Sequence, residues 1–333
     1  MFLPKFLISL ACALQLTPQT ANAANFSPLV FHVTLGSSEA IVLATMHASR
    51  IPATALSALA DQVLTGANVL AIESLNNESA ERELDALFAG NANDDASSFS
   101  ALTKQSQSCV EHILNVKLSL APELIAKLKK QHLSRIAAIS WGALVPAFGF
   151  ALFPGFDRVL LEHAVARKME IVELEGAAAA YKYDRALPLS TIKADIQQVC
   201  LAINDSAQMA EYEREQRELF VLFELGKLDS ARRRLFELNL HRMNFSRGDL
   251  AFSDNRNVLI ASNLLLSLKK YKKSVIAIGP MHFTGPSAIQ IQLESKGATV
   301  RRIDLRNAYF RPRAPDGVMP TSGSQQSKGT ATE

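Results

Sequence analysis

The chain contains three short apolar runs, rich in β-branched residues, and each is followed by a polar side chain that can bind a metal. The runs and these residues are Ala40–Thr45 with His47, Val69–Ile72 with Glu73, and Ser274–Ile278 with His282. Short apolar runs that end at Gly, Pro or polar residues are typical of buried strands. In open α/β sheets, ligands bind just beyond the carboxyl ends of the strands. Two imidazoles and one carboxylate form a ligand set for a divalent transition metal.

Helical patterns follow two of these predicted strands. Pro52–Thr65 carries apolar residues at helical spacing. A second helix is predicted to open at Gly285 and Pro286 and to continue to about Lys296. Ala298–Asp304 then has the pattern of another strand. Each end of the chain is therefore expected to form a strand–helix–strand unit.

The pattern between the two ends is mostly helical. Helices are predicted at Ser79–Ala89, Phe156–Arg167, Leu228–Met243 and Asn255–Lys270, with one or two long helices at Pro188–Leu225 and a helical stretch broken by Pro and Gly at Phe99–Gly155. Asp254 is expected to cap the last of these helices. Glu170–Leu174 is a further strand, and Leu29–Leu35 forms a hairpin with the first apolar run. We therefore predict an α/β (α+β) fold with a mixed central sheet built from the N- and C-terminal βαβ-like segments, and a long helical middle segment that covers its carboxyl edge.

Length and charge limit the class of protein. The chain has 333 residues, of which 48% are hydrophobic, and this is enough for a sizeable core. The formal net charge is +3, and no basic stripe with interleaved aromatic residues is present, so we expect no nucleic-acid partner. The most apolar later stretch, Trp141–Pro154, is interrupted by prolines, so we expect no transmembrane segment in the mature chain.

Residues 1–23 have the features of a secretory signal peptide. Lys5 supplies the positive charge, Phe6–Leu16 the apolar stretch, and Ala21-Asn-Ala23 the small-residue cleavage site. The alternative is a buried N-terminal helix. We expect cleavage after Ala23, a periplasmic or extracellular location, a folded domain at 24–310 and a disordered tail at 311–333, which is rich in Pro, Gly, Ser and Thr.

Two cysteines remain after the predicted cleavage. Cys109 and Cys200 can pair in an oxidising compartment, or they are two unrelated buried thiols. Neither has a nearby histidine or a Cys-x-x-Cys spacing, so we do not expect a cysteine nucleophile.

Three further residues are candidates for the same site. Glu175, which follows a predicted strand, is either a fourth ligand or general base, or it complements the dipole of the next helix. Arg256 and Asn257 sit at a predicted helix start, where they either anchor substrate or form an ordinary cap and surface ion pair. A metal here would polarise a scissile carbonyl and lower the pKa of a water molecule, and Glu73 or Glu175 would take the proton.

Short motifs along the chain make it resemble the TraB/PrgY/GumN family, which is related to the Tiki metalloproteases. The matching segments are Gly279-Pro-Met-His282 and Ala44-Thr-Met-His47 for two Gly-x-x-His motifs, Leu70-Ala-Ile-Glu73, Phe156-Asp157, Glu170-Ile-Val-Glu-Leu-Glu175, Phe223-Glu-Leu-Gly226 and Arg256-Asn257. They occur in the family order between about Phe31 and Asp304. At Ala44, alanine stands where the family has glycine, and alanine resists conformations that glycine allows.

The resemblance implies an α/β domain related in fold to erythromycin esterase and to a haem-binding surface protein. For the Tiki branch it also implies a metal-dependent peptidase activity with manganese or cobalt. We therefore expect a secreted metal-dependent hydrolase, peptidase-like by this resemblance, that acts on a peptide or small-molecule substrate. The expected roles are metal ligands for His47, Glu73 and His282, catalysis for Glu73 and Glu175, and substrate binding for Arg256 and Asn257.

The alternative function is a non-catalytic binding module that sequesters a small ligand such as a signalling peptide or haem. Ala44 favours this alternative, whereas the retained His47, Glu73 and His282 favour the hydrolase. The sequence has no His-Glu-x-x-His helix, no Gly-x-Ser-x-Gly elbow, no phosphate-binding glycine loop and no dinucleotide fingerprint. These absences argue against a standard zincin, a serine hydrolase, an NTPase and a dehydrogenase.

Overall fold

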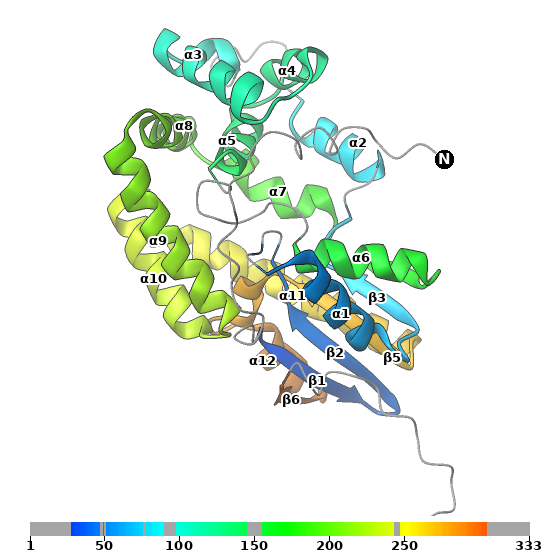
Figure 1. Ribbon diagram of the computed structural model, residues 1–333. Coiled ribbons are helices and arrows are strands. Elements are labelled where there is room, and N and C mark those ends of the chain that lie inside the picture. The colour runs from blue at the N-terminus through cyan, green and yellow to red at the C-terminus, as the bar shows by residue number, and fades with distance from the viewer. Residues whose placement is uncertain are drawn as a thin grey trace, which may run out of the picture.

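The computed structural model of the chain describes residues 28–46, 49, 51–75, 78–89, 98–144, 155–242 and 247–304 (Figure 1). The predicted leader at 1–23, the predicted tail at 311–333 and His47 lie outside the described residues. The described chain forms one six-stranded sheet, with helices on both of its faces and a further block of helices beyond one end of the strands.

The six strands form a mixed sheet in the order β4-β3-β5-β2-β1-β6. Their bounds are β1 Val30–Leu35, β2 Ser38–Ala44, β3 Val69–Ile72, β4 Glu170–Glu173, β5 Lys273–Ile278 and β6 Thr299–Ile303. Strands β4, β3, β5 and β2 are parallel, whereas β1 is antiparallel to both β2 and β6. Although β2 and β3 are consecutive in the chain, β5 from the C-terminal part lies between them. The prediction that strands from the two ends of the chain share one sheet is confirmed.

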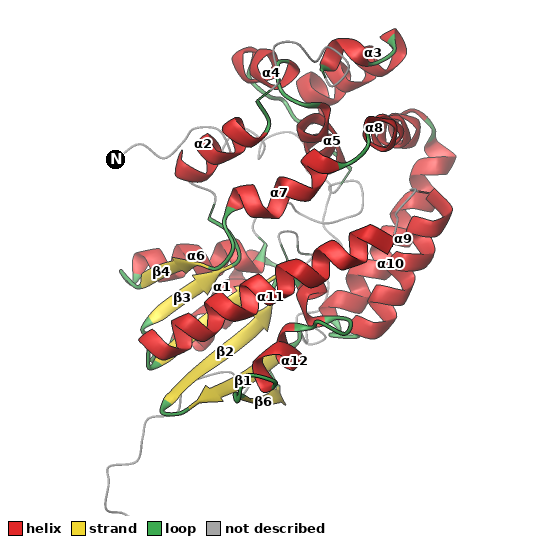
Figure 2. Ribbon diagram, turned by 180° about the vertical axis from the view of Figure 1, so that it is seen from behind, coloured by secondary structure: helices red, strands yellow, loops and turns green. Residues whose placement is uncertain are grey.

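Helices cover both faces of the sheet (Figure 2). One face packs against α1 (Ala53–Leu64) and α6 (Phe156–Ala166), and the other packs against α11 (Arg247–Lys270) and α12 (Ile289–Glu294). Alternate residues of a strand face opposite layers. In β5, Val275 and Ala277 pack toward α1, whereas Ile276 and Ile278 pack toward α11. The central strands are apolar at nearly every position, and this agrees with a sheet that is covered on both faces.

A second layer of helices lies beyond the carboxyl ends of the parallel strands. These helices are α2 Glu78–Leu87, α3 Lys104–His112, α4 Pro122–Lys129, α5 Leu133–Gly142, α7 Ala177–Ala186, α8 Leu189–Asn204, α9 Ser206–Glu224 and α10 Leu228–Arg242. Short turns of other helix types occur at Phe99–Ala101, Ile113–Lys117 and Pro280–Phe283, the last labelled η7. The views show α2–α5, α7 and α8 on the side toward which β2 and β3 point, with α9 and α10 as a hairpin beside them. The predicted helical middle segment is therefore present.

The structure differs from the predicted helices in three places. Helix α11 begins at Arg247, so Asp254 lies inside the helix and the prediction that it is the cap is wrong. The sequence pattern does not predict α7, because this alanine-rich segment has helix propensity without a clear apolar period. Helix α12 is limited to Ile289–Glu294 and begins later than predicted, because Gly285 has a positive φ and lies in a turn. Among the described helices, none is both long and apolar enough to span a membrane.

A disulfide joins Cys109 in α3 to Cys200 in α8. The two cysteines are 91 residues apart in the sequence, and the helices that carry them pack against each other. Of the two alternatives that the sequence leaves open for these cysteines, the structure contains the paired one. A crosslink over such a long loop restricts the unfolded chain and so stabilises the helical block.

We expect loss of this disulfide to destabilise the protein. Loop-closure entropy assigns about 4 to 5 kcal/mol to a crosslink over roughly 90 residues. The double variant Cys109→Ala/Cys200→Ala should therefore unfold at a clearly lower urea concentration, as measured by circular dichroism. Reductant should shift the parent in the same direction and leave the double variant unchanged. Free thiols at both positions in the unreduced native protein would contradict the disulfide.

Candidate active site at the carboxyl ends of three central strands

The ends of β2, β5 and β3 lie side by side and form the floor of the candidate site. In the sheet register, Ala44 pairs with Ile278, and Ile72 pairs with Ala277. The segments that follow the three strands therefore leave the sheet at the same edge. The helices α1 and α6 cover one face while α11 and α12 cover the other, so the connections diverge at this point. Divergence of this kind marks the usual ligand crevice of open α/β sheets.

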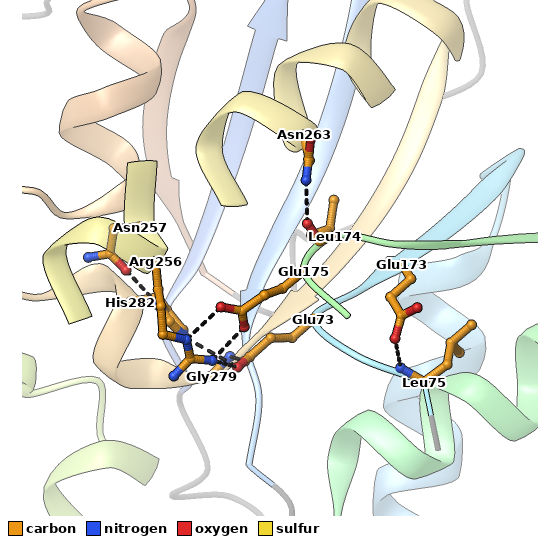
Figure 3. A network of polar contacts seen from close by, with 10 residues as sticks. All are labelled: Glu73, Leu75, Glu173, Leu174, Glu175, Arg256, Asn257, Asn263, Gly279 and His282. Atoms are coloured by element: carbon orange, nitrogen blue, oxygen red, sulfur yellow. Dashed lines mark hydrogen bonds and ion pairs between the residues drawn. The ribbon is translucent and has the colours of Figure 1, made fainter. Parts of the chain in front are cut away.

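Glu73 is at the centre of a network of polar contacts (Figure 3). Its Oε1 accepts a hydrogen bond from Arg256 NH2 at 2.6 Å and lies 3.3 Å from His282 Nε2. Its Oε2 accepts a hydrogen bond from the Gly279 backbone N–H at 2.9 Å. Burial by itself would raise the pKa of this carboxyl group, but His282, the Arg256 charge and the Gly279 N–H lower the pKa to about 2. Glu73 is therefore fully ionised at neutral pH.

His282 is held by a residue of α11. The ring lies in η7, and its Nδ1 is 2.5 Å from the Asn257 Oδ1. The Asn257 side chain is fully buried, and its Nδ2 donates to Ser287 Oγ at 3.2 Å. An amide oxygen can only accept, so this contact places the proton of the ring on Nδ1. The other ring nitrogen, Nε2, faces Glu73 Oε1, so it either donates an N–H to this carboxylate or, when a metal ion takes the place of that proton, binds the ion together with Glu73.

Arg256 and Glu175 form a second part of the network. Arg256 donates from Nε and NH2 to the two oxygens of Glu175, and both distances are 2.6 Å. The same NH2 group bridges to Glu73. Burial would lower the pKa of the guanidinium, but its contacts with Glu175 and Glu73 raise it above the usual range. The Glu175 side chain is completely buried, so this bidentate contact is an internal ion pair.

Asn263 is a positioning residue that the sequence reasoning missed. Its Nδ2 donates to the backbone carbonyl of Leu174 at 2.6 Å, and the next residue, Glu175, donates its N–H to the carbonyl of Glu73 at 3.0 Å. These two bonds fix the chain just after β4. In the sequence, Asn263 could have been recognised as a polar residue within the apolar part of this helix, next to the buried Leu264.

Five predicted site residues meet in this network. For two of them, Arg256 and Asn257, the predicted position at the start of a helix is wrong. Arg256 and Asn257 lie within α11 and not at its start, because the helix begins at Arg247. Neither side chain is an ordinary helix cap or surface ion pair. Glu175 faces Arg256 while α7 begins after Gly176. His47 follows the end of β2 by three residues and lies outside the described residues.

The two positions that correspond to the family glycines have different backbone requirements. Ala44 is the last residue of β2 and has ordinary extended backbone, so alanine fits there without strain. At Gly279, an added Cβ would lie 3.0 Å from Glu73 Oε2 and 3.6 Å from the His282 ring. Gly279 therefore allows its backbone N–H to approach the carboxylate, whereas the Ala44 substitution has no such consequence.

The described residues supply two donor atoms for a metal ion. Two ligands about 2.1 Å from one ion lie about 3.0 to 3.4 Å apart at common coordination angles. The 3.3 Å between Glu73 Oε1 and His282 Nε2 agrees with this range, and the Asn257 contact gives the ring the orientation of a ligand. Within the described ranges, no three His, Cys, Asp or Glu side chains form a group that could hold an ion. A complete site therefore needs a further ligand, for which His47 is the sequence candidate.

The low pKa of Glu73 predicts a pH dependence of stability. A carboxyl group with a pKa of about 2 in the folded chain and 4.5 as the reference value stabilises the fold above pH 4.5, and this contribution is lost as the pH falls toward 2. The full contribution is about 3 kcal/mol, of which about 2 kcal/mol is lost between pH 6 and pH 3. Glu73→Gln should therefore show a smaller fall in unfolding free energy over this interval, measured by urea titration at each pH. An equal fall in the unfolding free energy of parent and variant would show that the contacts of Glu73 do not lower its pKa in the folded protein.

Gly279→Ala should disturb the same carboxylate without straining the backbone. The added methyl would push Glu73 away and weaken the Gly279 N–H bond, at a cost of about 1 to 2 kcal/mol in unfolding free energy. Gly142→Ala is the matched control, because a Cβ there has open space and alanine is a better helix former. Urea unfolding should show a loss for the first variant and none for the second. A similar effect of both substitutions would rule out a special role of Gly279.

A comparison with family models gives a match over most of the chain. The model of the TraB/PrgY/gumN family matches residues 29–302, a range that contains Glu73, Glu175, Arg256, Asn257 and His282. Neither a comparison with curated proteins nor one with solved structures found a match. The family match agrees with the resemblance of the sequence motifs. The chain belongs to the TraB/PrgY/gumN family.

Proposed function

We propose that the protein is a metal-dependent hydrolase of peptidase type. The observation that carries the proposal is the pair formed by Glu73 and His282 at the ends of adjacent strands, with Asn257 orienting the ring. An ionised carboxylate and an oriented imidazole are suited to a divalent ion such as manganese or cobalt. His47 is proposed as the third ligand on the basis of its position after β2.

Each described residue then has a role that follows from its contacts. Glu73 and His282 would hold the ion, which polarises a scissile carbonyl and activates water when bound. A carboxylate with a pKa of about 2 is a weak base, so Glu73 is better suited to binding the ion than to accepting a proton. Asn257 keeps the Nδ1 proton of His282 in place.

Arg256 is placed to act on the substrate electrostatically. Its guanidinium is fixed by the bidentate contact with Glu175, and its NH2 extends to Glu73. A fixed positive charge beside the ion-binding residues would stabilise negative charge that develops on a substrate oxygen. Both Glu175 oxygens already accept hydrogen bonds from Arg256. These contacts favour a positioning role for Glu175, which would hold Arg256 in place, and they argue against Glu175 as a fourth ligand or general base.

A secreted location is part of the proposal. The Cys109–Cys200 disulfide is consistent with an oxidising compartment, because such crosslinks persist mainly outside the cytosol. The signal-like sequence at residues 1–23 supports the same location, with cleavage after Ala23 and a periplasmic or extracellular mature protein.

One observation favours a second candidate, a non-catalytic module that binds a peptide or haem. Arg256 supplies positive charge to both Glu73 and Glu175, so this cluster is electrostatically complete without a metal ion. A module of this kind would bind its ligand near the same strand ends but would have no turnover. Metal-dependent turnover therefore distinguishes the two functions.

The proposal predicts a manganese site that depends on His282. In calorimetric titration of the mature chain, the parent should bind manganese, while His282→Ala and His47→Ala should lose binding. Asn257→Ala should retain the ligands but weaken binding by about tenfold, because the ring loses its orientation. His163→Ala is a matched control, since His163 contacts Asp61 on the far helices α6 and α1. Manganese-dependent cleavage of a peptide library should follow the same order.

Two outcomes would contradict the hydrolase. If the parent does not bind manganese or cobalt, the metal-dependent mechanism is excluded. If the parent binds the metal and cleaves no peptide, while it retains a small ligand, the binding module is the better description. If manganese binding were lost equally in His163→Ala and His282→Ala, the loss would come from a disturbed fold and not from removal of a metal ligand.

A further inference from the structure

Arg232 on α10 holds a positive charge against the turn that carries His282. Its NH1 lies 3.5 Å from Thr284 Oγ1, two residues after His282. The guanidinium lies directly over Gly285, because an added Cβ at that position would be only 1.4 Å from NH1. Gly285 also has a positive φ of 79°, which favours glycine. The turn is therefore shaped to admit this arginine side chain.

The charge of Arg232 has no carboxylate partner within the part of the chain that the structure describes. Among the described residues, its one polar contact is the Thr284 hydroxyl, which itself donates to the carbonyl of Met281 at 2.8 Å. The side chain is half-buried. A guanidinium has five N–H donors, and a partly buried cation is stabilised by an anion that accepts them. The contact of Arg232 with the described residues involves only one of these donor groups, NH1.

The two arginines that follow Arg232 in the sequence have different surroundings. Arg234 NH2 donates to Glu218 Oε2 at 2.9 Å, and its NH1 is 3.6 Å from Glu237. Arg233 is exposed, and together with Arg234 it lines a groove of about 620 Å³ between α9 and α10. Arg232 contacts the turn after β5 instead, and it lies next to the buried Ala231 and Leu228 positions of the same helix.

Residues 280–287 connect Arg232 with the candidate active site. Helix α10 packs on this turn from one side, and α11 packs on it as well. Asn257 from α11 contacts both His282 and Ser287, while Arg232 from α10 contacts Thr284 between them. The turn is tight, with backbone bonds from His282 N to Gly279 O and from Thr284 N to Met281 O. A ligand group at Arg232 would therefore lie close to the segment that positions His282.

We infer, on the basis of the proposed function, that Arg232, Thr284 and the Gly285 turn bind a carboxylate group of the peptide substrate. A carboxylate offers two oxygens in a plane, which matches two parallel N–H donors of a guanidinium. The Thr284 hydroxyl is at the edge of this group and can reorient toward an anion. The inferred site binds the substrate chain next to the reacting centre and so selects peptides that carry a free carboxylate.

A ligand-observed ¹⁹F NMR titration tests this inference with the full mature protein. The probes are N-trifluoroacetyl-dialanine with a free carboxylate, the same peptide as its C-terminal amide, and inorganic phosphate as a competitor. Metal is removed on a chelating resin, because soluble chelators are themselves polycarboxylates. Without metal, the result is independent of the manganese site, so failure of the hydrolase proposal and failure of this inference are distinguishable.

Arg232→Met keeps a long apolar side chain and removes the guanidinium, and Arg233→Met makes the same change in charge at the neighbouring residue. The carboxylate peptide should bind the parent and Arg233→Met alike. Both the amide peptide on the parent and the carboxylate peptide on Arg232→Met should bind at least about tenfold more weakly. Thermal midpoints of the two variants should be similar, since a purely packing role of Arg232 would lower stability without changing binding.

Three results would overturn the assignment. The first is equal binding of the carboxylate and amide peptides to the parent. The second is a loss in Arg233→Met as large as that in Arg232→Met, which would place the anion in the groove between α9 and α10. The third is binding of phosphate that depends on Arg232 without binding of the carboxylate peptide, which would make the site one for free phosphate.

Discussion

The insertion of β5 between β2 and β3 is the constraint on which the candidate site depends. Thr45 and Ile278 are 233 residues apart in the sequence, yet the Thr45 N–H donates to the Ile278 carbonyl at 2.9 Å. Parallel neighbours carry their carboxyl ends to one edge of the sheet. Without this insertion, Glu73 and the turn of His282 would follow strands that are not adjacent. The order of the strands alone therefore brings the segments that carry the site residues to the same place.

The second constraint is the burial of negative charge at this edge. Glu73 and Glu175 are removed from water, and ionised carboxylates in that position need cations or N–H donors. Arg256, His282 and the Gly279 N–H meet this need, and all of them come from the C-terminal part of the fold. Removal of one partner from such a cluster leaves a buried charge uncompensated. The same contacts thus support the fold and fix the geometry of the candidate site.

The turn after β5 joins the sheet to the two helical layers. Asn257 holds it from α11, and Arg232 holds it from α10. Gly279 and Gly285 are the positions where the backbone must admit another side chain, Glu73 in one case and Arg232 in the other. One short segment therefore links Glu73 and His282, the residue that orients the His282 ring, and the arginine for which we infer substrate binding.

The sequence by itself determined the strands and the chemical character of their ends. Apolar runs, glycine and proline positions and the polar residue after each run are local features, so they predict β2, β3 and β5 together with Glu73 and His282. The long helical middle segment is also a local property. The local pattern also placed the start of α11 too late, because Gly248 and its polar neighbours obscure the helical period there.

The tertiary structure alone decided which of these groups contact each other. Local periodicity carries no information on strand order, so it did not show that Glu175 pairs with Arg256 or that Asn257 orients His282. It likewise left the pairing of Cys109 open, since this depends on how α3 and α8 pack. All of these contacts join residues far apart in the chain, and those of the candidate site exist because β5 and α11 return to the N-terminal strands.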